Sequence, residues 1–210
     1  MVDDNTLRED ISFLRQMAES GRKGPILGGI FLAAAGVVFG LACIVSWLGY
    51  QDILPIHGWG QFWIWIAAFV VFWIIWLVLF RRMRATNNAV GQGNASATFG
   101  VIWGVCGLAV MVAFAAVEVV TWRLNAPVVQ AGFVPIIFAF YGAAWMANGA
   151  LAKRRWMLVA GVGSYLFAFA IAFMADTTLQ VLVMGAGLLL LLTLPGLKLV
   201  ADEARPKGQQ

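Results

Sequence analysis

The chain has 210 residues, of which 62% are hydrophobic and only 11% carry a charge. Soluble domains are roughly 25% charged and about 45–50% apolar, so the composition excludes a soluble fold and predicts a chain solvated by lipid. The formal net charge of +4 does not indicate a nucleic-acid partner, because the basic residues cluster at the ends of apolar runs.

Residues 1–24 are polar and predict a short amphipathic helix followed by a linker. Thr6 and Glu9 form a capping-box pattern, and an apolar face follows at helical spacing: Leu7, Ile11, Leu14 and Met17. Acidic residues balance the arginines on the polar face, whereas helices dedicated to anionic lipid are more basic. We therefore expect the apolar face to dock on a protein partner.

Six apolar runs are long enough to cross a bilayer, which takes about 20 helical residues. They cover roughly residues 26–49, 61–80, 98–122, 128–151, 156–175 and 178–199. Alternating strand periodicity is absent, so these runs are helices. Short connections predict three antiparallel hairpins in an all-α integral membrane domain over residues 25–200. Residues 201–210 are expected to form a disordered tail.

All but one of the 14 Lys and Arg residues lie on one side of the membrane that these runs imply. They occupy the N-terminal segment, the second and fourth loops and the tail, and Arg123 is the exception. Cytoplasmic loops carry such an excess of basic residues. We therefore expect a multi-pass protein of the inner membrane, with both termini in the cytoplasm.

Two of the runs carry stripes of small residues on one helix face. The first has Gly29, Ala33, Gly36, Gly40 and Cys43, and the third has Ala97, Gly100, Gly104 and Gly107. In lipid such stripes let helix backbones approach closely. The sequence leaves open whether they serve contacts within the chain, contacts with a partner, or contacts between copies in a homo-oligomer.

The second run carries an aromatic stripe at steps of three and four: Phe62, Trp65, Phe69, Phe72, Trp76 and Phe80. Two interpretations are open. The rings line a groove for a flat apolar ligand such as a quinone or lipid tail, or they pack into the small-residue stripes or face lipid. We favour packing. Haem is not expected, because the one histidine, His57, lies in an outer loop.

Glu118 is the one acidic residue inside an apolar run, where charges are costly. It lies toward the outer end of its run, near Arg123 and Gln130. One interpretation makes it a protonatable ligand for a cation or a coupled proton. The favoured one makes it a carboxylate that reaches headgroup water or pairs with Arg123.

Prolines interrupt the fourth and sixth runs. Pro135 cannot donate a helical hydrogen bond to the carbonyl of Ala131, and Pro195 cannot donate one to Leu191. Broken helices build transporter sites. More often neighbouring groups satisfy the freed carbonyls, so we expect simple kinks here.

The sequence offers no catalytic, cofactor-binding or metal-binding cluster. Cys43 and Cys106 stand alone in separate apolar runs, and no nucleophile elbow or phosphate-binding glycine loop is present. We therefore predict a non-enzymatic accessory or regulatory subunit that docks a partner on the cytoplasmic face. The alternative is a small transporter or carrier of an apolar ligand or ion in helices 2–4. It ranks second because polar residues are scarce near the midplane.

Overall fold

A computed structural model describes residues 28–87 and 94–203 of the chain. This part contains six helices long and apolar enough to cross a membrane and no strand. The expected all-α fold with six helices of membrane-spanning length is therefore confirmed. The predicted N-terminal helix, including Leu7, Ile11, Leu14 and Met17, lies outside the described residues, and so does most of the predicted tail.

The six spans coincide with the predicted runs to within about four residues, except that the second span continues past residue 80 to Asn87. The first three are α2 (Gly29–Tyr50), α3 (Trp59–Asn87) and α4 (Asn94–Leu124). The fourth joins the 3-10 helix η1 (Pro127–Gly132) to α5 (Phe133–Ala152), and the fifth is α6 (Arg155–Ala172). The sixth joins α7 (Thr178–Leu188), the π-helical segment η2 (Leu189–Thr193) and α8 (Leu194–Glu203). The predicted tail therefore begins too early, because α8 continues to Glu203.

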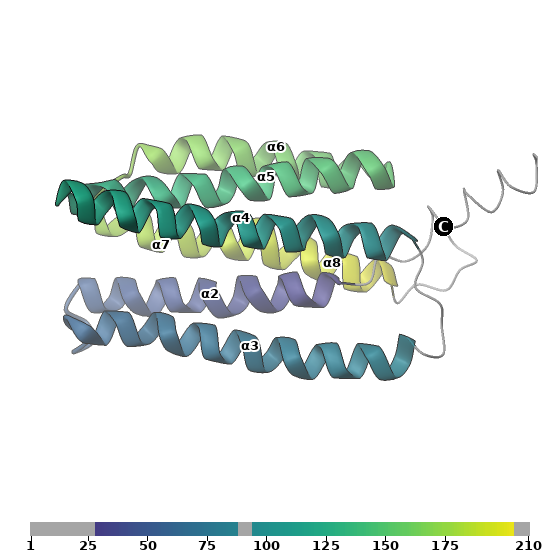
Figure 1. Cartoon of the computed structure of the whole chain (residues 1–210), viewed down its shortest axis with the longest axis horizontal. Coiled ribbons are helices and arrows are strands. Elements are labelled where there is room, and N and C mark those ends of the chain that lie inside the picture. The colour runs from purple at the N-terminus through teal and green to yellow at the C-terminus, as the bar shows by residue number, and fades with distance from the viewer. Residues whose placement is uncertain (1–27, 88–93, 204–210) are drawn as a thin grey trace, which may run out of the picture.

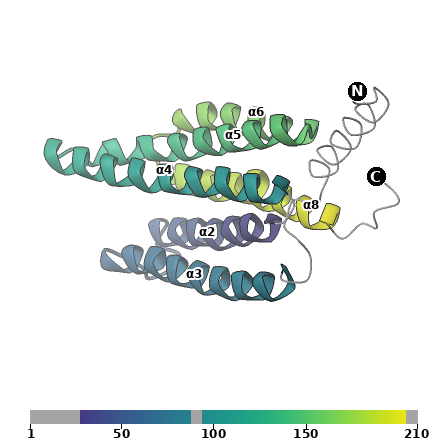
Figure 2. The same ribbon diagram turned by 45° about the vertical axis from the view of Figure 1, so that its right-hand side comes forward.

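The helices lie side by side, with α3 at one edge of the bundle and α6 at the other (Figures 1 and 2). Helix α2 packs between α3 and the last span, and α5 packs between α4 and α6. The two groups meet where Phe138 of α5 covers Gly187 of α7. One end of the bundle holds Arg154 and Lys198 together with the first residues of α2, and we call it the basic end.

Two of the three predicted hairpins pack as such, α2 with α3 and α4 with α5. The third prediction is wrong as a packing unit, because α6 lies mainly against α5 while α7 and α8 lie against α2. Small residues explain this preference. They line the facing sides of α2 and the last span, and they let these two helices pack closely although the helices are far apart in the sequence.

The contact between α2 and the last span is made at matched glycines. A Cβ at Gly29 would lie 2.5 Å from the carbonyl oxygen of Gly196, and one at Gly185 would lie 3.0 Å from that of Gly40. Gly36 faces Thr193, whose hydroxyl a Cβ would overlap. The predicted stripe on the first helix is thus a packing surface within the chain.

The interior of the bundle is centred on Trp145 of α5, which is fully buried. Its ring lies 5.1 Å from that of Trp103 in α4 and 5.8 Å from that of Trp156 in α6. Phe138, also fully buried, lies 4.6 Å from Phe167 of α6. Aromatic contacts of this kind bind α4 and α6 to α5 on opposite sides.

Candidate functional site

Glu118 lies on α4 near the end of the bundle opposite the basic end. The Nε2 of Gln130 in η1 donates hydrogen bonds to both of its carboxylate oxygens, at 3.0 and 2.9 Å. Short η1 begins at Pro127 and brings Gln130 back beside α4. The structure therefore brings together Glu118 and Gln130, as the sequence allowed.

Arg123 is exposed in the last turn of α4. Among the described residues no ion pair joins it to Glu118. The predicted pairing of the two is therefore not formed, because residues five apart lie on different faces of an α-helix, whose turn takes 3.6 residues. A carboxylate held by one amide can accept further hydrogen bonds from water.

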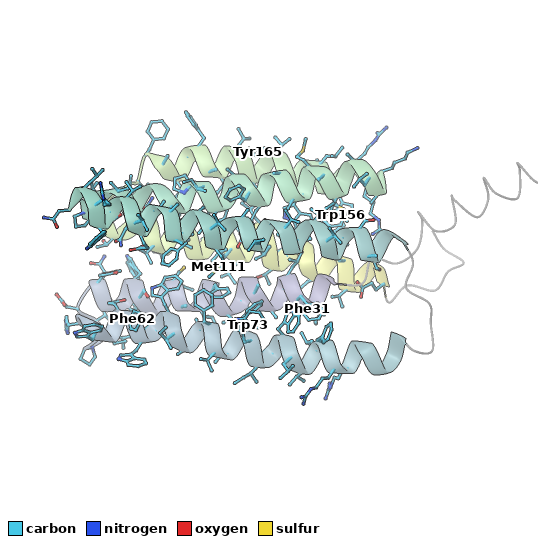
Figure 3. The ribbon with its side chains drawn as sticks, in the orientation of Figure 1. Phe31, Phe62, Trp73, Met111, Trp156 and Tyr165 are labelled. Atoms are coloured by element: carbon cyan, nitrogen blue, oxygen red, sulfur yellow. The ribbon has the colours of Figure 1, made fainter. Side chains whose placement is uncertain are left out.

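The aromatic stripe of α3 packs in part against rings of α2. Phe39 lies 5.2 Å from Phe69 and 5.4 Å from Phe72, and Phe31 lies 6.3 Å from Trp76. Figure 3 shows Phe31 where α2 meets α3. The rings therefore meet other rings and not the small-residue stripe of α2, which the last span already covers.

The rest of the stripe is open to the outside. Phe62 is half exposed, while Trp65 packs against the core. A shallow apolar depression beside the stripe is formed by α3 alone, from Ile66, Phe69, Val70, Trp73, Ile74 and Leu77. Because a single helix lines it, the depression faces outward from the bundle and does not enclose a ligand.

The small-residue stripe of α4 differs from that of α2, because no other helix of the described residues covers it. A Cβ built at Gly100, Gly104 or Gly107 would meet no atom within 4 Å, and Ala97 is exposed. Met111 continues the stripe one turn further, and in Figure 3 it lies on the side of α4 toward α2. Among the described residues the rings of α3 do not fill this stripe, so of the two alternatives for these rings, packing into a small-residue stripe is not seen.

Several of the buried polar side chains inside the bundle make structural hydrogen bonds. Asn148 and Ser164 each donate to the carbonyl four residues earlier, Ala144 and Ala160, at 2.8 and 2.9 Å. Sequence reasoning missed Gln180 and Trp145, which donate between helices to Ala131 and Leu191. A signal existed, because those carbonyls are the two that Pro135 and Pro195 free.

Charged groups link three helices at the basic end. Arg154 donates from Nη1 to Oδ2 of Asp202 in α8 at 3.3 Å. The Glu203 carboxylate lies against the backbone N–H groups of Gly28 and Gly29, where α2 begins, and near Arg154. Acidic groups are favourable at a helix amino terminus, which explains why α8 extends past its predicted boundary.

Other titratable side chains do not assemble into a reactive group in the described part of the chain. Cys43 and Cys106 are buried free thiols, and the exposed His57 ring contacts Asp52 at 2.8 Å. No group of three or more His, Cys, Asp or Glu side chains within the described ranges has the arrangement of a metal site. No family model, curated protein or solved structure matches this chain.

Proposed function

We propose that this chain is a non-enzymatic accessory or regulatory subunit, which works by binding another membrane protein. The observation that supports the proposal is the uncovered small-residue face of α4, made of Ala97, Gly100, Gly104 and Gly107. We call it the α4 glycine face.

A glycine on a helix face that contacts only lipid gains no close packing with another helix. Each glycine within a helix costs roughly 0.5–1 kcal/mol relative to alanine, and that cost is offset where a second backbone approaches closely. On α2 the last span provides this contact. On α4 a transmembrane helix of a partner protein would provide it.

The surroundings of the α4 glycine face suit a partner helix. Val101, Val105 and Leu108 stand beside it and are each more than 60% exposed. Aliphatic ridges next to a glycine groove are the shape into which a second helix fits with close backbone contact. The helix itself is held in place by α5 and η1, so the face is presented on a fixed support.

We further propose that the protein lies in the inner membrane with both termini in the cytoplasm. The clustering of Lys and Arg at one end of the spans supports this orientation. A soluble part of the partner would then meet the cytoplasmic face, where the sequence predicts the docking helix with Leu7, Ile11, Leu14 and Met17.

Photo-crosslinking in native membranes tests the proposal. A photoreactive residue replaces Gly104 on the α4 glycine face, and the matched control replaces Val159, a lipid-exposed position on α6. We expect one defined protein adduct from position 104 and only lipid adducts from position 159. Lipid adducts alone at both positions would contradict the proposal. An adduct between two copies of this chain would contradict it as well, because the α4 glycine face would then serve self-assembly and not the binding of another protein.

A further inference from the structure

Helix α5 and the last span each contain a proline whose missing N–H leaves a carbonyl without its helical partner. Pro135 leaves the carbonyl of Ala131, and Pro195 leaves that of Leu191. Within a membrane an unsatisfied carbonyl is costly, because no bulk water reaches it. Each freed carbonyl therefore needs a hydrogen-bond donor from another part of the chain.

Both carbonyls receive a side-chain donor, and each donor comes from the other proline-containing span. Gln180 of α7 donates from Nε2 to Ala131 at 2.9 Å. Trp145 of α5 donates from Nε1 to Leu191 at 3.0 Å. Gln180 is only 4% exposed and Trp145 is 0% exposed. The exchange is reciprocal and both donors are held inside the bundle.

The two bonds lie at different depths. Gln180 and Leu191 are separated by roughly 16 Å along the last span, at 1.5 Å per residue. Two attachment points so far apart restrain both the tilt and the rotation of α5 against the last span, whereas one bond would leave a pivot.

The inner attachment point is also supported from the opposite side. Leu191 lies in the π-helical segment η2, where Thr193 donates from its hydroxyl to Leu188 at 3.5 Å. Gly36 of α2 lies directly against Thr193 and the carbonyl of Leu188. The widened turn is therefore enclosed between Trp145 on α5 and a glycine on α2.

We propose that Gln180 and Trp145 act as a reciprocal clamp. Their hydrogen bonds hold the backbone rigid at two joints, the points where Pro135 and Pro195 interrupt the helical hydrogen bonding. On this account α5 and the last span form one frame with α2. On the same account the proline sites of this protein do not act as hinges or as an ion site.

Double-mutant cycles on the full-length chain in detergent test the clamp through its melting temperature. Gln180→Leu leaves the Ala131 carbonyl without its donor, and we expect the melting temperature to fall by about 4–8 °C. Pro135→Ala restores a backbone N–H for that carbonyl. In the Pro135→Ala background the loss caused by Gln180→Leu should therefore shrink to less than half.

The second joint supplies the matched control. Trp145→Phe should be compensated by Pro195→Ala in the same way, whereas Pro195→Ala should not reduce the loss caused by Gln180→Leu. Where a single variant yields no folded protein, recovery of folded protein in the matching double variant is the readout. Equal losses with and without the matching proline, or equal rescue by either proline substitution, would overturn the clamp.

Discussion

Glycines at corresponding places in two similar stretches of sequence have opposite surroundings. The stretch from Gly36 reads GVVFGLACIV and that from Gly100 reads GVIWGVCGLA. In the first, Gly36 and Gly40 contact the last span, while in the second Gly100 and Gly104 contact no other helix within residues 28–87 and 94–203. A methyl group should therefore have opposite effects on the stability of the purified chain at the two places.

Gly36→Ala should lower the melting temperature by at least about 4 °C, because the methyl group collides with Thr193 and with the Leu188 carbonyl. Gly104→Ala should raise it by about 2–4 °C, because alanine favours the helix and meets no neighbour. Thermal melts in detergent, followed by size-exclusion chromatography, measure both. A shift of the same sign in both variants would refute the difference between the two faces.

Among the elements, α3 is attached mainly through rings. Its described contacts are with α2, and Phe39 sits between Phe69 and Phe72. Aromatic pairs of this kind contribute roughly 0.5–1.5 kcal/mol each beyond the area that they bury. The aromatic stripe therefore serves first to hold α3 on the bundle, and its outer rings are left to face the membrane.

Phe39→Leu should lower the melting temperature by about 3–6 °C, since it removes two ring contacts at once. Trp73→Leu is the control, because Trp73 is 57% exposed and lines the outer depression of α3. That variant should melt within about 2 °C of the parent chain. A larger loss from Trp73→Leu than from Phe39→Leu would show that the outer face of α3 carries the packing.

At the scale of the whole molecule, the described helices form a packed frame with two outlying spans. Helices α2, α5, α6 and the last span bury much of their surface, while little of α3 or α4 is buried. Both outlying spans expose long apolar faces. In a bilayer these faces would be in contact with lipid or with other membrane proteins.

Orientation can be measured with thiol reagents, because both native cysteines are buried and should give little background. We expect His57→Cys to react with a membrane-impermeant maleimide on intact cells, and Gln209→Cys to react only after the cells are permeabilised. The reverse pattern would place both termini outside the cytoplasm and contradict the orientation inferred from charge.

The spans were predictable from sequence, but most of their pairings were not. Apolar runs of about 20 residues are sufficient to locate helices in lipid. Pairing depends on which small faces meet, and a stripe on α2 does not reveal that Gly185 and Gly196 lie opposite it. Similarly, the prolines identified the carbonyls of Ala131 and Leu191, but only three-dimensional packing shows that Gln180 and Trp145 reach them.

The candidate site was predictable to a smaller extent. Glu118 and Gln130 could be paired because a short turn separates their helices. The openness of the α4 glycine face was not predictable, because Gly100 and Gly104 repeat the pattern of the covered glycines on α2. Which of two such stripes remains free depends on the packing of all six spans.

The central claim is that the α4 glycine face binds a partner helix, and recovery of that partner with tagged variants tests it most directly. Gly104→Leu adds bulk to the face, while Ala170→Leu places the same side chain at an exposed position on α6. Both variants should fold and insert normally. We expect recovery of the protein crosslinked at position 104 to fall about tenfold or more for Gly104→Leu and to stay unchanged for Ala170→Leu. Undiminished recovery with Gly104→Leu would contradict the account.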